Sequence, residues 1–166
     1  MSKSIVFNLS EDSISKAIRE LEKYKGELKN KAHLLIERLT DYGVEVAKAQ
    51  VRELGAIYTG ELEESITGYY SPSTQVGIII TDAPHAVYVE FGTGVVGKDS
   101  SHPVADLQGW RYDVNNHGEK GWWYFNERDQ KWHWTKGIES RPFMYNTVQI
   151  LERECMKIAR EVFGRG

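Results

Sequence analysis

The chain is poor in the features that stabilise small extracellular proteins or place a chain in a membrane. Cys155 is the only cysteine among 166 residues, so no internal disulfide can form, and its position in a helical pattern predicts a buried structural thiol. No apolar run approaches the roughly 20 residues that span a bilayer, and residues 1–4 lead into no signal-like apolar stretch. We therefore expect no membrane partner, and a protein made and kept in a cytoplasm.

A large excess of charge of either sign is also missing. The chain has 21 basic and 24 acidic residues and a net charge of -3, so it has no global field that would draw it to nucleic acid. Lysines and glutamates alternate over residues 20–31, which is the pattern of a solvated helix face. Recognition of a specific nucleic acid is therefore disfavoured.

Signatures of catalytic and metal sites are absent as well. The sequence has no G-x-S-x-G nucleophile motif and no H-x-x-x-H, H-E-x-x-H or C-x-x-C spacing for a metal. Four single histidines in the loop-rich half would converge only through the fold: His85, His102, His117 and His133. The sequence therefore predicts no catalytic residue, no bound metal and no cofactor.

A glycine motif in the middle of the chain imitates a nucleotide-binding loop. Gly92, Gly94 and Gly97 have the spacing of a dinucleotide fingerprint, and residues 92–98 match most of G-x-x-x-x-G-K. Asp99 stands where a Ser or Thr should bind magnesium, and its negative charge opposes phosphate. Both motifs need a strand before the glycines and a helix after them. Because residues 82–92 predict a helix and residues 98–103 a turn-rich loop, we reject nucleotide binding.

The predicted short helix places Glu90 near a core. Asp82 can cap this helix, Pro84 suits its first turn, and Gly92 can end it in a left-handed conformation. A carboxylate near a core must find a partner, such as Arg141, Thr93 or a backbone donor. We interpret Glu90 as a structural anchor for the turn at residues 92–93, because a glycosidase-like second acid is lacking.

The N-terminal third predicts one amphipathic helix over residues 10–55. Ser10 is its expected N-cap and Gly55 its stop. At 1.5 Å per residue this helix would be about 60 Å long, more than a domain of this size covers. We therefore expect either a kink near Gly26, within residues 24–30, or packing against another subunit. Its apolar positions recur every three or four residues: Ile14, Ile18, Leu21, Tyr24, Leu28, Ala32, Leu35, Leu39, Tyr42, Val46 and Ala49.

Two β-hairpins follow in the sequence pattern. Residues 65–70 and 75–81 flank a Ser-Pro-Ser-Thr turn, and the second run is apolar on both faces, which predicts that both faces are covered. All five tryptophans lie between residues 109 and 135, mostly in a second hairpin of residues 122–126 and 131–134. This hairpin either completes the sheet, the interpretation we favour, or binds a partner. The candidate interface residues are Trp122, Trp123, Trp132 and Trp134.

These elements predict an α+β fold in which helices pack on an antiparallel sheet. A closing helix is expected over residues 142–163, with Pro142 in its first turn. We predict a single domain with a β-rich core over residues 61–144 and an aromatic insertion over residues 97–140.

Three motifs, in their order along the chain, resemble the tail-component family of long-tailed bacteriophages, also described as head-tail joining or tail-completion proteins. The family signatures are T-G-x-L-x-x-S-I, A-P-[YH]-A-x-Y-V-E-[FY]-G-T and R-P-F before a C-terminal helix. The chain departs in lacking a Pro before the T-G pair and in having a longer segment 97–140. The matching positions are Thr59, Gly60, Leu62, Ser65, Ile66, Ala83, Pro84, His85, Ala86, Tyr88, Glu90, Phe91, Gly92, Thr93, Arg141, Pro142, Phe143 and Met144.

The resemblance implies a non-enzymatic virion component that assembles, as a ring, where the tail meets the head connector. Its partners would be copies of itself and tail-tube, tail-terminator or head-connector proteins, and it would occur in the virion and, during assembly, in the host cytoplasm. A ring needs two complementary patches per subunit, for which the candidates are residues 92–103 and 122–134.

Two functions of other classes stay open. One is a phage hydrolase or nuclease with His85, Glu90, Asp99 and His102 around a metal. The other is a binding module for single-stranded nucleic acid or sugar, with an aromatic platform of Trp122, Trp132 and Trp134.

Overall fold

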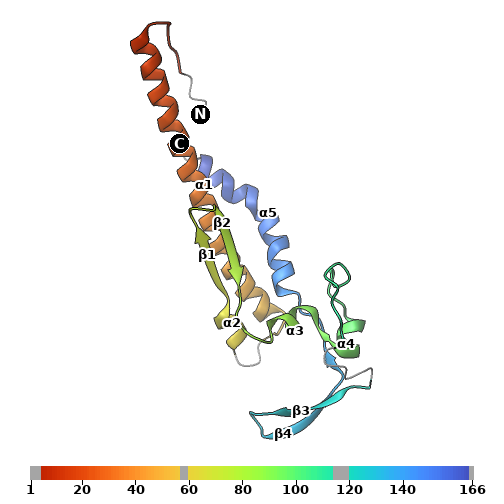
Figure 1. The fold of residues 1–166 in the computed structure, drawn as a ribbon. Coiled ribbons are helices and arrows are strands. Elements are labelled where there is room, and N and C mark those ends of the chain that lie inside the picture. The colour runs from red at the N-terminus through yellow and green to blue at the C-terminus, as the bar shows by residue number, and fades with distance from the viewer. Residues whose placement is uncertain (1–4, 57–59, 114–119, 165–166) are drawn as a thin grey trace.

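The computed structural model describes residues 5–56, 60–113 and 120–164. The fold is α+β: a long N-terminal helix, a C-terminal helix, short helices between them, and two separate two-stranded antiparallel sheets in the described part of the chain. The molecule is elongated (Figure 1), with the N-terminal helix projecting at one end and the second hairpin at the other.

Helix α1, Glu11–Glu53, is a single unbroken helix, so the predicted kink near Gly26 is wrong. The Ser10 side chain accepts a hydrogen bond from the Ser13 amide, and Gly55 follows the helix with a φ of +63°, so both predicted ends are confirmed. An exposed glycine costs a helix only about 1 kcal/mol, which the good helix formers around it outweigh. The helix is about 64 Å long at 1.5 Å per residue.

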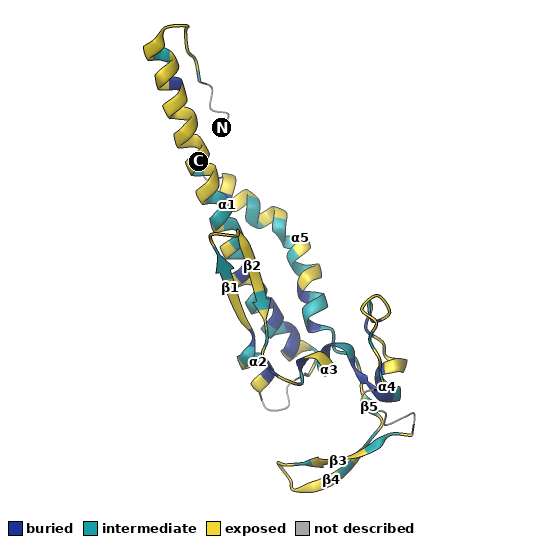
Figure 2. Cartoon of the chain, viewed as in Figure 1, coloured by how far each residue is buried: buried dark blue, intermediate teal, exposed yellow. Residues whose placement is uncertain are grey.

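The two halves of α1 have different surroundings. Its C-terminal half contributes Ala47 and Val51 to the core, which continues through buried residues of later elements. Its N-terminal half is almost entirely exposed (Figure 2). The core cluster consists of Ala47, Val51, Ala56, Leu62, Ile66, Ala83, Ala86 and Phe143.

Helix α5, Phe143–Gly164, runs antiparallel to α1 and packs on the C-terminal part of that helix only. Near the end of α5, the Phe163 carbonyl accepts a hydrogen bond from Lys31 Nζ. Residues 11–30 of α1 therefore extend beyond the last turn of α5. Cys155 lies on α5 and is half-buried, so the expectation of a buried thiol is wrong.

The first hairpin packs closely on α1. Strands β1, Thr67–Ser71, and β2, Val76–Ile80, pair as predicted, with Tyr69 opposite Ile78. Gly77 lies so close to Thr40 of α1 that a Cβ would stand 2.0 Å from the threonine Oγ1. Only the α1 side of β2 is covered, however, because Ile79 packs on the core while Ile78 and its neighbours on the other face are exposed. The prediction that both faces are covered is therefore wrong.

Short helices connect the hairpins. Helix α2, Glu61–Ser65, precedes β1, and helix α3, Ala86–Phe91, follows β2. The predicted helix before the glycine motif thus exists, but it begins after His85, so neither Asp82 nor Pro84 belongs to it. Helix α4, Gly94–Asp99, forms where the sequence predicted no helix. The loop that contains His102 follows this helix directly.

The second hairpin stands apart from the first. Strands β3, Trp122–Asn126, and β4, Lys131–Thr135, pair as predicted, but they form their own sheet and do not complete the first one. The favoured interpretation of this hairpin is therefore wrong. A two-residue strand, β5, Gly137–Ile138, follows it and bridges to Thr93 and Gly94. The hairpin is joined to the body through this connection.

Candidate interaction surfaces

The motif residues before β1 act in the core. Gly60 has a φ of +85° at the N-cap of α2, while Leu62 and Ile66 are buried in the main cluster. Ser65 Oγ donates to the Leu62 carbonyl and bonds the Thr81 hydroxyl at 2.6 Å, which ties α2 to the end of β2. Thr59 lies outside the described residues. The described part of this motif is therefore a packing element.

The second motif divides between core and junction. Ala83 and Ala86 belong to the core, whereas Pro84 is exposed. Tyr88 lies against Trp110, and Phe91 stacks on the same indole with ring centres 5.0 Å apart. Trp110 Nε1 also donates to the carbonyl of Gly92, so these aromatic rings hold the segment after α4 against α3.

Glu90 is 8% exposed and caps α5 from a different element. Its Oε2 accepts from the Met144 amide, and its Oε1 accepts from the Tyr145 amide, both at 2.9 Å. A carboxylate at a helix N-terminus satisfies amides that have no partner within the helix and complements the helix dipole. Glu90 is thus a structural anchor with backbone donors, but it anchors α5 and not the turn at residues 92–93.

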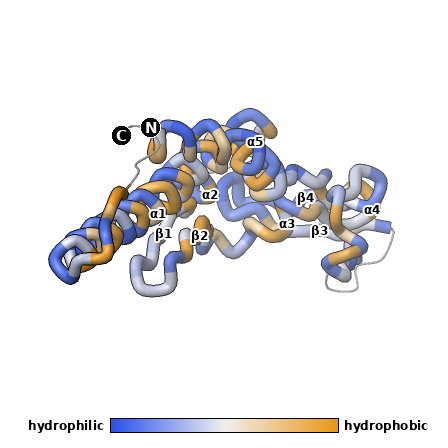
Figure 3. Tube along the Cα trace, turned by 90° about the horizontal axis from the view of Figure 1, so that it is seen from above, coloured by the Kyte–Doolittle hydropathy of each residue, from blue (hydrophilic) through white to orange (hydrophobic). Residues whose placement is uncertain are grey.

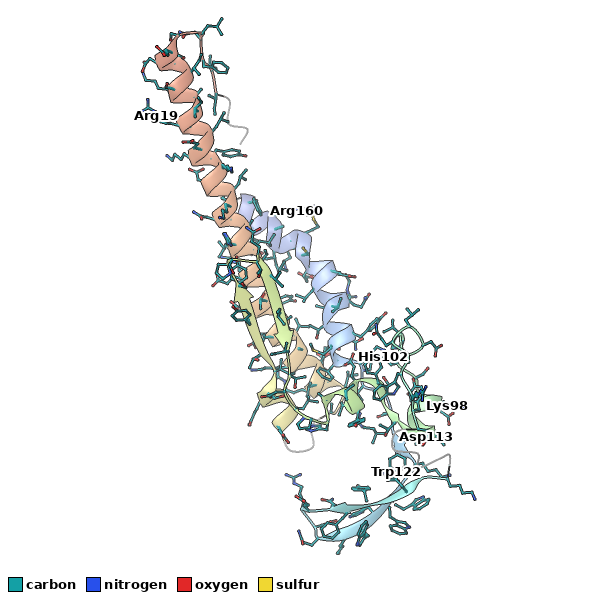
Figure 4. All side chains as sticks on the ribbon, viewed as in Figure 1. Arg19, Lys98, His102, Asp113, Trp122 and Arg160 are labelled. Atoms are coloured by element: carbon teal, nitrogen blue, oxygen red, sulfur yellow. The ribbon has the colours of Figure 1, made fainter. Side chains whose placement is uncertain are left out.

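His102 completes this node. The Val104 amide donates to His102 Nδ1 at 3.2 Å, so the ring proton resides on Nε2 and is donated to Glu90 Oε1 at 3.0 Å. Both side chains are buried, and Figure 4 shows His102 between α4 and α5. Phe91 and Tyr145 pack against the imidazole. All the polar atoms of the node are therefore used in bonds that hold three segments together.

The third motif locks the start of α5 to α1. Arg141 Nη1 donates to the Gly55 carbonyl at 3.0 Å, and the Arg141 amide donates to the Val89 carbonyl. Pro142 stands immediately before α5, and Phe143, 1% exposed, is among the most buried side chains. Arg141 does not bond Glu90, in contrast to one of the expected pairings; its side chain bonds Glu139 instead.

The glycine motif is a close backbone junction. A Cβ on Gly97 would stand 2.9 Å from the Ile138 carbonyl, and one on Gly137 only 1.8 Å from the Thr93 carbonyl. Thr93 is buried, and its Oγ1 accepts from the Ile138 amide. Gly92 has a positive φ of +77°, as predicted, but its ψ of 168° makes it extended, so the chain leaves α3 towards β5. Steric demand thus explains the glycine spacing that resembles a nucleotide fingerprint.

The proposed metal-binding histidines and acids do not form a cluster. Glu90 and His102 meet, but in the described part of the chain no three His, Cys, Asp or Glu side chains gather as a metal site would require. His117 lies outside that part. No described helix combines the length and apolarity needed to cross a bilayer.

The aromatic hairpin has two unlike faces. One face, here called the aromatic face, consists of Trp123, Phe125, Trp132 and Trp134, which pair across the strands with ring centres 5.5 and 5.6 Å apart. The other face has Tyr124 stacked on His133, together with the half-buried Trp122, which Figure 4 shows at the base of the hairpin. Of the predicted interface residues, Trp122 therefore does not share the surface of the other three, and Phe125 takes its place. Strand alternation alone could have shown this.

A second apolar surface runs along the bare half of α1. We call it the apolar stripe: Ile14, Ile18, Leu21, Tyr24 and Leu28, all exposed. Figure 3 shows hydrophobic segments recurring along this part of the helix between hydrophilic ones. The sequence predicted the stripe, and it predicted that so long a helix would either kink or pack against another subunit; the structure shows the helix unbroken and the stripe exposed.

The loop proposed as an assembly patch has fewer exposed apolar side chains than the aromatic face or the apolar stripe. Within residues 92–103, Thr93 and His102 are buried, and so are the three glycines of the motif. Of its apolar side chains, Val96 is exposed and Val95 half-buried. The loop is thus an internal junction at its glycines, whereas residues 98–101 and Pro103 are exposed, so an assembly patch here stays a prediction.

Comparison with known proteins gives no relative. No protein-family model matches the chain, and no curated protein or solved structure is significantly similar to it.

Proposed function

We propose that this chain is a non-enzymatic structural protein of a long-tailed phage or prophage, of the head-tail joining or tail-completion type. It acts in the virion, and in the host cytoplasm during assembly, by forming a ring between tail and connector. Its partners are further copies of itself and tail-tube, tail-terminator or head-connector proteins.

One observation supports this proposal above the others: most described motif residues serve packing, while two exposed apolar surfaces, the aromatic face and the apolar stripe, stand at opposite ends of an elongated chain. An exposed apolar surface of several side chains is typical of a protein that binds another protein. Two such surfaces at opposite ends suit a subunit that contacts one neighbour with each end.

The two alternatives have less support. A hydrolase that used Glu90 and His102 would need them accessible to substrate, but both are buried and their polar atoms are bonded to each other and to backbone amides. A platform for single-stranded nucleic acid combines aromatic rings with a basic groove, and the net charge of -3 does not provide a basic surface overall.

The function is tested in the phage or prophage that encodes the chain. Deletion of its coding sequence should leave heads and tails that are separately complete but unjoined in electron micrographs, and supplying the wild-type chain in trans should restore joined particles. Normal infectious particles without the chain would contradict the proposal.

The hydrolase alternative is tested on the same purified protein. We expect no stoichiometric transition metal by elemental analysis, and Glu90→Gln should affect particle assembly only as far as it lowers stability. One metal per chain, together with a hydrolytic activity that Glu90→Gln abolishes, would contradict the assembly function and favour the hydrolase.

A further inference from the structure

The aromatic face and the apolar stripe are two exposed apolar surfaces that the fold leaves unexplained. On the aromatic face, Trp123 is 60% and Trp132 64% exposed. An aromatic side chain has roughly 150–250 Å² to bury, and about half of it is exposed here, so the face offers roughly 400 Å². That is within the range of functional patches on soluble proteins.

The apolar stripe matches this face in size. Ile14 to Leu28 span about 21 Å along a helix, and five-residue strands such as β3 and β4 span about 17 Å. Leu21, at the centre of the stripe, is 55% exposed. Either surface could therefore cover most of the other.

We propose that the aromatic face of one copy packs, head to tail, on the apolar stripe of α1 in a second copy of this chain. This inference rests on the proposed assembly function and specifies the contact between neighbouring subunits. The two surfaces stand at opposite ends of the molecule (Figure 1), so they meet only between copies. When two copies are joined in this way, one aromatic face and one apolar stripe of the pair stay free. Further copies can therefore add at both ends, which generates a ring or a filament.

Lys25 favours this pairing over two stripes packed together. It follows Leu21 by four residues and precedes Leu28 by three, so it lies on the same helix face as both. In a pair of stripes this ammonium group would lose water against mainly aliphatic side chains, with Tyr24 as the one aromatic ring of each stripe, and none of the five stripe residues is a carboxylate that could pair with it. Against tryptophan rings it gains a cation–π interaction instead, and Lys29, one turn later, lies at the margin of the same surface.

The contact is small, which sets the expected affinity. The aromatic face and the apolar stripe together bury roughly 800 Å², which is below the roughly 1,200 Å² of specific stable interfaces and in the range of weak, transient ones. We therefore expect a dissociation constant of roughly 1–100 µM for a single contact, with ring closure adding stability because each subunit is then held twice.

The test uses two single-surface variants of the full chain in sedimentation velocity. Phe125→Ser damages the aromatic face, and Leu21→Gln damages the apolar stripe. We expect the wild-type chain to associate with rising concentration, each variant alone to stay monomeric, and an equimolar mixture of both to form a dimer. The mixture restores one contact, because the first variant keeps its stripe and the second its aromatic face.

Matched controls separate the contact from general damage. Tyr124→Ser changes the adjacent residue, which is 43% exposed against 42% for Phe125, on the opposite face of β3. Lys23→Gln changes an exposed residue on the far side of α1 from the stripe. Both controls should associate like the wild type, and circular dichroism should show that all four variants are folded.

Each other outcome overturns the proposal. Dimers of Phe125→Ser alone would show that stripes pair with stripes, and dimers of Leu21→Gln alone would show that aromatic faces pair with each other. A wild-type chain that is monomeric at about 0.5 mM, which is above the whole range expected for the dissociation constant, has no such contact. Binding of a single-stranded oligonucleotide that is lost in Phe125→Ser, without self-association, would assign the face to nucleic acid.

Failure of this contact can be told from failure of the proposed function. If Phe125→Ser supports joined particles as well as the wild type, the contact is wrong and the function stands. If the mixture forms dimers but deletion of the chain leaves particles normal, the contact stands and the function is wrong.

Discussion

At the scale of single residues, the buried node of Glu90 and His102 is the most constrained place in the molecule. One carboxylate accepts three hydrogen bonds, two from amides at the start of α5 and one from an imidazole. Hydrogen bonds that an ionised carboxylate accepts are stronger than those between neutral groups, because the charge attracts the donated proton. A residue that resembles a catalytic acid in the sequence therefore holds an element in place.

Glu90→Gln tests this role. An amide NH₂ group cannot accept, so at least one of the three donors loses its partner, and we expect a loss of about 1–3 kcal/mol in the free energy of unfolding by chemical denaturation. Glu139→Gln is the control, because its exposed pairing with Arg141 should contribute at most about 1 kcal/mol. Equal effects of the two substitutions would contradict the anchor role.

Tyr70 joins β1 to α1 through a hydrogen bond with His33 and gives a pH dependence. Burial, and secondly the negative charge of Glu37, raise the pKa of the Tyr70 hydroxyl above its ordinary value of 10.0. The unfolded chain then ionises first, so the stability from this group is complete below pH 10.0 and is lost as pH rises from there through the raised pKa. Glu37→Gln should lower the pKa of Tyr70 in an NMR titration, whereas Glu20→Gln on the bare half of α1 should leave it unchanged.

At the scale of elements, α1 shows that helix continuity and helix cover are separate matters. The bare half of α1 persists because local preferences along it agree, with an N-cap, an acidic first turn and a run of good helix formers. Gly26 is its weakest position, and a Cβ added there would have nothing within 4 Å.

Gly26→Ala should therefore strengthen the helix without disturbing any contact. We expect a gain of about 1 kcal/mol in local helix stability, seen as slower amide hydrogen exchange over residues 18–30. Global unfolding should change less, because this half is not packed on the core. Faster exchange in the variant would show that the glycine is needed for bending.

The junction between α4 and β5 depends on the absence of side chains. Gly137 has a φ of +104°, and its Cα faces the Thr93 carbonyl. Gly137→Ala should destabilise the chain by about 1–3 kcal/mol through strain and collision. Gly109→Ala separates the two causes, because Gly109 also has a positive φ, of +64°, but nothing within 4 Å. If Gly109→Ala lowers the free energy of unfolding by as much as Gly137→Ala, the close approach to the Thr93 carbonyl adds nothing to the effect of the positive φ.

At the scale of the whole molecule, the body and the second hairpin are held by different contacts. The body has a common core of α1, the first hairpin, α2, α3 and α5, whereas β3 and β4 pack chiefly on each other. Such an arrangement suits an arm that reaches a neighbour.

Excision of the hairpin tests this division. Removing residues 122–135 and joining Gly121 to Lys136 by a short glycine linker should change the free energy of unfolding of the body by less than about 1 kcal/mol, because little core area is lost. Self-association should disappear. A variant that fails to fold would show that the hairpin stabilises the body.

The sequence by itself determined the local structure of this protein. The period of three to four residues and the caps at Ser10 and Gly55 predicted α1, and strand alternation predicted both hairpins, because these patterns depend on neighbours along the chain. Only the tertiary structure decided what covers each element. It left the stripe of α1 and one face of β2 exposed, and it separated the aromatic hairpin from the first sheet. It also placed the nucleotide-like glycines where the backbone of β5 passes too closely for a side chain, and it placed Glu90 where its carboxylate caps α5. These outcomes depend on contacts between residues far apart in the sequence, such as Glu90 and Tyr145, 55 positions apart, and Lys31 and Phe163, 132 positions apart, which no local pattern specifies.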